Sequence, residues 1–170
     1  MVIKRPGFTL IEFLVIAAVL GILTMSMVPS ILNTMETRAL ENTTREVIST
    51  LEKAKFEAVK TKFNHRIRFQ SQDGTWRLIL EKEEPPGTWV PLPDFPPRRI
   101  DARFNVTLNL PPSDQAVEFS QLGFITNHDK DYNTILIQSD KLKKQSQDDQ
   151  RAIIVLASGS FRYLKSASET

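Results

Sequence analysis

The chain has 170 residues, and its 22 basic and 20 acidic side chains give a formal charge of +2, which is too balanced for a generally basic nucleic-acid-binding protein. It contains no cysteine, so disulfides and thiolate metal sites are excluded. With only two histidines and no G-x-S-x-G, Walker or H-E-x-x-H motif, the sequence predicts no enzyme, no catalytic residue and no cofactor.

A long apolar run begins close to the N-terminus. Residues 8–32 contain one ionisable side chain, Glu12, and a helix of this length at ~1.5 Å per residue reaches across the ~30 Å hydrocarbon core of a bilayer. Lys4 and Arg5 precede the run, which favours a cytoplasmic N-terminus. A carboxylate inside a membrane costs roughly 2.5–3.5 kcal/mol near the bilayer centre, so we expect Glu12 to have a partner.

Three interpretations of this N-terminus compete. A secretory signal has a shorter apolar region of about 7–15 residues and a small-residue cleavage site, neither of which fits here. A plain membrane anchor explains the length of the run and the basic flank but does not explain the presence of Glu12. The third interpretation, processing of a filament subunit, accounts for all of these features.

The segment Gly7-Phe8-Thr9-Leu10-Ile11-Glu12 resembles the processing motif of type IV prepilins and of type II secretion pseudopilins. The resemblance implies that residues 1–7 form a leader, that a prepilin peptidase cleaves between Gly7 and Phe8, and that Phe8 is then N-methylated. It also implies that Glu12 meets the Phe8 amine of a neighbouring subunit during assembly. Pro29 lies where this family commonly has a proline, and it is a possible helix break.

Cleavage after Gly7 would remove Lys4 and Arg5 and leave 20 basic and 20 acidic side chains. The resemblance places the subunit in the bacterial inner membrane as a single-pass protein, with its C-terminal domain in the periplasm, before it becomes part of a filament.

Beyond Pro29 the pattern becomes amphipathic, and residues 33–63 are predicted to continue the same helix to about Lys62. Apolar or small residues recur at three- and four-residue steps and should form the packed face: Leu32, Met35, Ala39 or Leu40, Thr43, Val47, Leu51, Ala54 and Ala58. Charged residues should form the solvated face: Glu36, Arg38, Glu41, Arg45, Glu52, Lys53, Glu57 and Lys60.

Residues 64–170 read as a periplasmic β-rich globular domain. The Asp73-Gly74 pair predicts a hairpin between His65–Gln70 and Thr75–Lys82. Prolines from Pro85 to Pro97 predict a long surface loop. Further strands are predicted at about 103–110, 116–119, 134–138, 152–157 and 161–164. The predicted fold class is therefore α+β and pilin-like, with a long N-terminal helix, half transmembrane and half amphipathic, packed on an antiparallel β-sheet domain.

Three segments resemble the GspH/FimT branch of the pilin family. Residues 54–60 (Ala-Lys-Phe-Glu-Ala-Val-Lys) resemble the end of its long helix, with Lys55 in place of the usual arginine. Residues 119–123 and 158–162 resemble the two glycine-containing turns of its β-domain.

Several polar segments are predicted to be turns, loops or solvent-exposed faces. The stretch Asn127–Asn133 gathers oxygen ligands that could suit calcium, but it lacks the glycine that an EF-hand loop needs, so a turn and no metal site is predicted. Ser139–Gln150 is expected to be a flexible loop. Arg66 and Arg68 should lie on one solvent-exposed strand face.

The leading hypothesis is a minor pseudopilin, a structural subunit of the periplasmic pseudopilus of a type II secretion system. Its expected partners are other pseudopilins or pilins, the prepilin peptidase, the inner-membrane assembly platform and secreted cargo. The alternative is a FimT-like minor type IV pilin that binds DNA during uptake or takes part in pilus assembly, with Arg162 and Lys165 as the candidate contacts. Few cations lie near this C-terminus, so nucleic acid is the less favoured partner.

Overall fold

The structure is a computed structural model that describes residues 8–111, 115–131 and 133–165, without the side chains of residues 25–29. The chain divides into two compact units, Met1–Met35 and Glu36–Thr170. A single helix, α1 (Leu10–Thr61), runs through the boundary between them. The predicted helix is therefore observed with nearly the predicted ends, whereas the predicted leader, residues 1–7, lies outside the described residues.

In the first unit the described structure is the beginning of α1, and its backbone stays helical through Pro29. The helix thus continues past the possible break predicted at Pro29. Within the described residues, no helix is long and apolar enough to cross a membrane, so the span predicted for residues 8–32 is not confirmed.

In the second unit α1 buries one stripe of side chains at three- and four-residue spacing: Glu36, Leu40, Thr44, Val47, Leu51, Ala54, Glu57 and Ala58. The predicted packed face was right at Leu40, Val47, Leu51, Ala54 and Ala58. It was wrong at Thr43, since Thr44 is the buried threonine, and at Leu32 and Met35, which are exposed. Glu36 and Glu57 were placed on the solvated face and are in fact buried. For Glu36 the reason is a polar partner in the β-domain, described below.

Among the described residues, nine strands follow the helix and form two antiparallel sheets. The five-stranded sheet has the order β3-β2-β1-β6, with β4 also paired to β2, and the four-stranded sheet has the order β5-β7-β8-β9. The bounds in the first sheet are β1 (His65–Gln72), β2 (Thr75–Glu83), β3 (Trp89–Pro91), β4 (Arg98–Arg99) and β6 (Ala116–Phe119). Those in the second are β5 (Phe104–Asn109), β7 (Thr134–Ser139), β8 (Gln150–Val155) and β9 (Phe161–Leu164).

The β1–β2 hairpin forms at the predicted turn, where Asp73 and Gly74 both have positive φ, as a two-residue hairpin turn requires. Two predictions about loops need correction. The proline-rich segment contains β3, which ends at Pro91, and β4, and both pair with β2. The segment expected to be a flexible loop contains the short helix α2 (Asp140–Lys144), which Ser139 caps and which buries Leu142 in the core.

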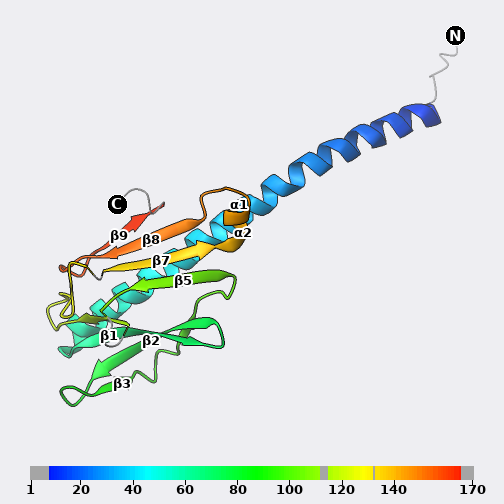
Figure 1. Ribbon diagram of the computed structural model, residues 1–170. Coiled ribbons are helices and arrows are strands. Elements are labelled where there is room, and N and C mark those ends of the chain that lie inside the picture. The colour runs from blue at the N-terminus through cyan, green and yellow to red at the C-terminus, as the bar shows by residue number, and fades with distance from the viewer. Residues whose placement is uncertain (1–7, 112–114, 132, 166–170) are drawn as a thin grey trace, which may run out of the picture. The chain divides into compact units, whose positions relative to one another are not determined.

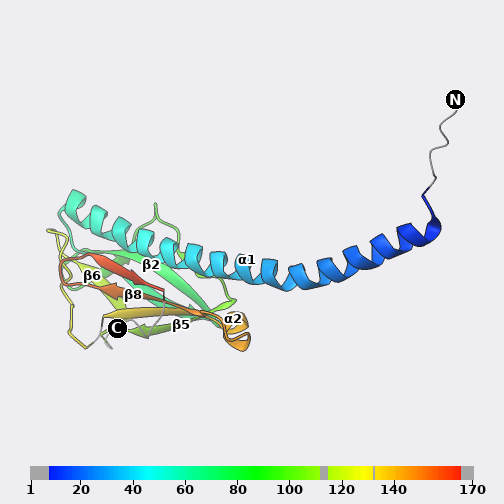
Figure 2. The ribbon, with the colours of Figure 1, turned by 90° about the horizontal axis from the view of Figure 1, so that it is seen from above.

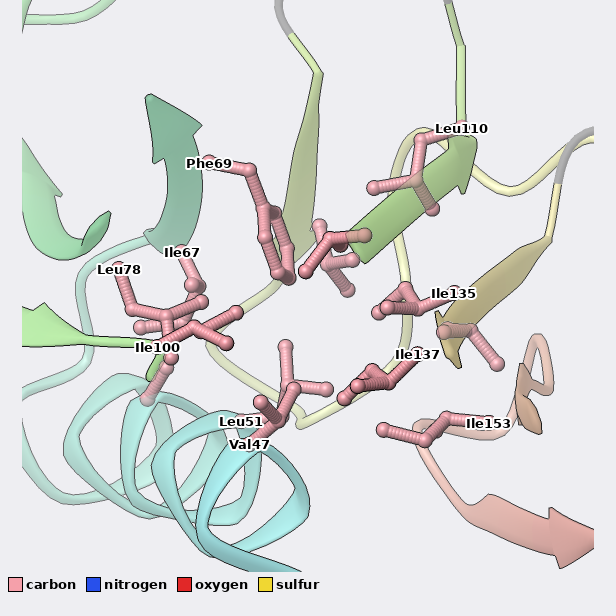
Figure 3. Close-up of a cluster of buried hydrophobic side chains, with 14 of the residues drawn as sticks. Val47, Leu51, Ile67, Phe69, Leu78, Ile100, Leu110, Ile135, Ile137 and Ile153 are labelled. Carbon is pink, nitrogen blue, oxygen red and sulfur yellow. The ribbon is translucent and has the colours of Figure 1, made fainter. Parts of the chain in front are cut away.

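The core of this unit lies between the α1 stripe and the inner faces of both sheets (Figure 3). Val47 and Leu51 of α1 point toward Ile67 of β1, Ile137 of β7 and Ile153 of β8. Figure 2 shows both sheets on the same side of this part of α1. Because one helix face covers two sheets, the sheets' outer faces and the opposite face of the helix are left for contacts with solvent or partners.

Candidate functional site

The first turn of α1 is closed by a pair of side chains that cap each other. The Glu12 N–H donates to Thr9 Oγ1 at 3.3 Å, while Glu12 Oε2 accepts from the Thr9 backbone N–H at 2.9 Å and from its hydroxyl at 2.8 Å. This is a capping box, in which the residue before the helix and the third helical residue satisfy each other's free N–H groups. The T-x-x-E spacing of a capping box is present in the sequence, but assembly was the only role predicted for Glu12.

Glu12 is surrounded by exposed apolar side chains from every side of the helix. Phe8 is 71% exposed and Leu10 is 80% exposed, and exposure continues through Ile11, Phe13, Leu14, Val15, Ile16, Val19, Leu20, Ile22 and Leu23. A helix that is apolar all round is normally buried, either in lipid or among other helices. The predicted processing residue Phe8 and the predicted assembly residue Glu12 thus lie close together at the start of the helix, and the other processing residue, Gly7, lies outside the described residues.

A second feature joins the three segments that resemble the GspH/FimT branch. Lys55 of α1 donates through Nζ to the carbonyl oxygen of Gly159 at 2.9 Å and approaches that of Ser158 at 3.4 Å. Gly159 lies against the carbonyl of Gly123, so close that a Cβ at Gly159 would come within 2.1 Å of that oxygen. A Cβ at Gly123 would in turn meet Lys55 and Val59 at 3.0–3.2 Å. The helix end and the two glycine turns therefore form one junction.

The candidate nucleic-acid contacts Arg162 and Lys165 lie on other elements than the arginines of β1 and Arg103. Arg162 on β9 and Lys165 just beyond it are exposed and belong to the four-stranded sheet or its end. Arg66 and Arg68 lie on β1 in the five-stranded sheet. Arg103 points back to α1, where its Nη1 lies 3.3 Å from Glu36. The C-terminal contact proposed for DNA thus consists of Arg162 and Lys165 without Arg66, Arg68 or Arg103.

Arg66 corrects the expectation of a solvent-exposed strand face, because it is only 7% exposed. Its Nε donates to Glu81 at 2.6 Å, and Arg68 binds the other oxygen of the same carboxylate at 2.8 Å. The Arg66 guanidinium also lies over the Trp89 ring at 4.4 Å. Two guanidinium groups on one buried carboxylate make a specific charge network, which alternation along the strand alone did not predict.

Glu36 connects α1 to the four-stranded sheet. Its carboxylate accepts from Ser139 Oγ at 2.9 Å and from Arg103, while Ser139 also caps α2. Arg103 in turn binds Asp101, and hydrogen bonds from Arg103 hold the pKa of Asp101 below its usual range. The same bonding raises the pKa of Arg103. These contacts explain why a glutamate occupies the first position of the buried stripe.

His65 is buried at the start of β1. Its Nδ1 lies 3.0 Å from the carbonyl oxygen of Phe63, an acceptor, so Nδ1 carries the proton and donates. Nε2 is buried and has no hydrogen-bond partner among the described residues. Burial therefore lowers the pKa of His65, although Phe63 and Glu57 act in the opposite direction. The ring is a neutral core side chain.

The described residues of the stretch from Asn127 to Asn133 form bends and irregular structure, without a helix or strand. Asn127 bonds to the backbone of Ala116 and Glu118 on β6, and Asp129 accepts from the Asp131 N–H at 3.0 Å. Within 8–111, 115–131 and 133–165, no three His, Asp or Glu side chains are grouped to hold a metal ion. The side-chain oxygens of Asn127 and Asp129 are thus engaged with the protein's own backbone.

The geometry defines a class of fold. A 52-residue helix, part of which packs on two antiparallel sheets, is an arrangement also found in a solved pseudopilin. The chain is similar to the solved structure of the minor pseudopilin EpsH from the type 2 secretion system of Vibrio cholerae, at 15% identity and a TM-score of 0.54. The match covers 71% of this chain and 91% of that one. No protein-family model and no curated protein matches the sequence.

Proposed function

We propose that this chain is a minor pseudopilin, a structural subunit of the periplasmic pseudopilus of a type II secretion system. The observation that carries the proposal is the accessible first turn of α1, where Phe8 and Glu12 stand in an otherwise apolar surface directly after Gly7. The likeness of the fold to EpsH supports the same role. The proposal makes the chain a binding protein and not an enzyme.

In this proposal the prepilin peptidase cleaves after Gly7, Phe8 is N-methylated, and the subunit waits in the inner membrane with its β-domain in the periplasm. The all-round apolar surface of residues 8–24 supports insertion into a bilayer or a helical bundle. The assembly platform would then extract the subunit, and the β-domain would contact other pseudopilins and secreted cargo.

The capping box gives Glu12 two successive tasks. In the free subunit its carboxylate is satisfied by Thr9. In a bundle of helices the same carboxylate could accept the cationic Phe8 amine of the neighbouring subunit, which fixes the register because a buried charge without a partner is strongly unfavourable. Because Thr9 satisfies the Glu12 carboxylate in the free subunit, the free-energy penalty of this carboxylate before a neighbouring subunit binds is smaller.

The alternative function is a FimT-like minor pilin that binds DNA or takes part in pilus assembly. It is supported by the exposed position of Arg162 and Lys165 at the end of β9. It is less favoured because DNA binding requires several cationic contacts to phosphates, and these two side chains supply few. A shift of labelled duplex DNA by the full chain, lost at moderate salt and in Arg162→Gln, would favour this alternative.

The first test is mass spectrometry of the protein extracted from membranes of its native cell. The expected result is a chain that begins with N-methyl-Phe8, and an intact Met1 terminus in cells with active peptidase would contradict the proposal. A second test separates the two tasks of Glu12. Glu12→Gln keeps the capping box, because glutamine can also bond the Thr9 N–H, but it removes the charge.

We expect Glu12→Gln to be processed normally but to enter filaments poorly, as measured by cross-linking to neighbouring subunits. Thr9→Ala is the matched control, because it removes the Thr9 hydroxyl partner and keeps the charge. Equal assembly of Glu12→Gln and the unchanged chain would show that the carboxylate is not needed.

A further inference from the structure

The strand register brings several arginines together on the outer face of the five-stranded sheet, among them Arg66, whose contacts with Glu81 are described above. In β2, Leu78 and Leu80 point into the core, so Arg77 lies on the outer face. Arg99 of β4 is the direct cross-strand partner of Arg77. Arg68 of β1 pairs with Ile79, one position along the same face from Arg77. We call Arg68, Arg77 and Arg99 the arginine face; β1 and β2 are labelled in Figure 1.

The charges of this face are unequally compensated. Arg68 is bound by Glu81 through Nε at 2.9 Å and Nη2 at 2.8 Å. Among the described residues, neither Arg77 nor Arg99 forms an ion pair. The Arg77 Nε atom is buried and lacks a hydrogen-bond partner in the same part of the chain. Two cations directly opposite each other and a buried N–H without an acceptor both destabilise a sheet, so an added anion would relieve both.

In β4 (Arg98–Arg99), only the arginine on the outer face lacks an acidic partner among the described residues. Arg98, the preceding residue, points to the opposite side of β4 and lies 3.5 Å from Glu46 of α1. Its charge is therefore compensated by Glu46, whereas Arg99 has no acidic partner within the part of the chain that the structure describes.

The carboxylates that share the outer face with the arginine face favour a short anion over an extended one. The same outer face carries Glu81 and Glu83 on β2 and Glu118 on β6, because alternation and register place them there. Glu81 and Glu118 are paired with Arg66 and Arg68, whereas Glu83 forms no ion pair among the described residues. An extended polyphosphate that reached Arg77 and Arg99 and continued along β2 would approach Glu83 and be repelled there. A short acidic segment would not, and a protein carboxylate can take two N–H bonds from a guanidinium fork.

We propose that Arg77 and Arg99 bind a carboxylate-bearing segment of another protein subunit, which docks on the outer face of the five-stranded sheet. The inference rests on the proposed function, since an assembly subunit requires lateral partners. It adds the position of one contact and the chemistry of the group that it accepts.

The test is binding of a fluorescein-labelled hexaglutamate peptide to the full chain in detergent, measured by fluorescence anisotropy at low salt. Arg99→Gln and Arg77→Gln are each expected to raise the Kd about tenfold, the effect of losing one charge-assisted hydrogen bond. Arg98→Gln is the matched control, because it removes the same charge from the adjacent residue and the opposite face. Its Kd should stay within about twofold of that of the unchanged chain.

Arg99→Lys adds a second discrimination, because it keeps the charge and loses the guanidinium fork. An intermediate Kd supports docking of a carboxylate by the fork. Equal effects of Arg98→Gln and Arg99→Gln, no peptide binding, or tighter binding of a duplex DNA than of the peptide would each overturn the proposal. Near-ultraviolet circular dichroism confirms that each variant is folded. The processing of Phe8 is measured separately, so failure of peptide binding is distinguishable from failure of the proposed function.

Discussion

The junction of the two glycine turns with α1 gives the sharpest stability prediction. In Gly159→Ala, the new Cβ would lie 2.1 Å from the Gly123 carbonyl oxygen and 3.3 Å from Lys55 Nζ. The residue also has φ +70°, a left-handed conformation that costs a non-glycine residue roughly 1–2 kcal/mol. Because the contacted oxygen belongs to the backbone, one of the turns must move, which adds roughly 1–3 kcal/mol.

Gly74→Ala is the matched control for this prediction. Gly74 has φ +72° but nothing lies within 4 Å of its Cβ position, so it carries only the backbone cost. Unfolding in urea, followed by circular dichroism on the full chain, should therefore show a free energy of unfolding roughly 1–3 kcal/mol lower for Gly159→Ala than for Gly74→Ala. Equal losses in the two variants would refute the close approach of the turns.

Two further predictions concern buried ionisable groups. Glu81→Gln removes the carboxylate that Arg66 and Arg68 share, while Arg66, which is 7% exposed, keeps its longer contact with Glu118 at 3.8 Å. We expect the free energy of unfolding to fall by roughly 1.5–3 kcal/mol in urea denaturation, the cost of losing hydrogen bonds to a charged group, and a loss below about 1 kcal/mol would contradict the buried network. Burial lowers the folded-state pKa of His65, so its contribution to stability is complete above the unfolded-state value of about 6.5 and is lost as pH falls through that value toward the folded-state pKa. Urea midpoints measured from pH 8 to pH 5 should decline less steeply in His65→Gln than in the unchanged chain, and parallel declines would exclude His65 as a cause.

Local patterns were sufficient to predict much of the fold. The helix ends, the Asp73-Gly74 hairpin and the positions of most strands follow from periodicity and turn chemistry, which depend on residues a few positions apart. The short strands β3 and β4 were missed because they exist only by pairing with β2. The helix α2 was missed because its one buried side chain, Leu142, gives no periodic signal in five residues.

The sequence by itself determined the candidate processing and assembly residues, because Gly7, Phe8 and Glu12 are adjacent in the chain and stand out against apolar neighbours. Only the tertiary structure decided which distant residues share a site. It joined Lys55 to Gly159, separated the charge of Arg98 from that of Arg99, and buried Glu36 against Ser139. The physical reason is that a side chain's burial and partners depend on strand register and helix packing, which connect positions up to about a hundred residues apart.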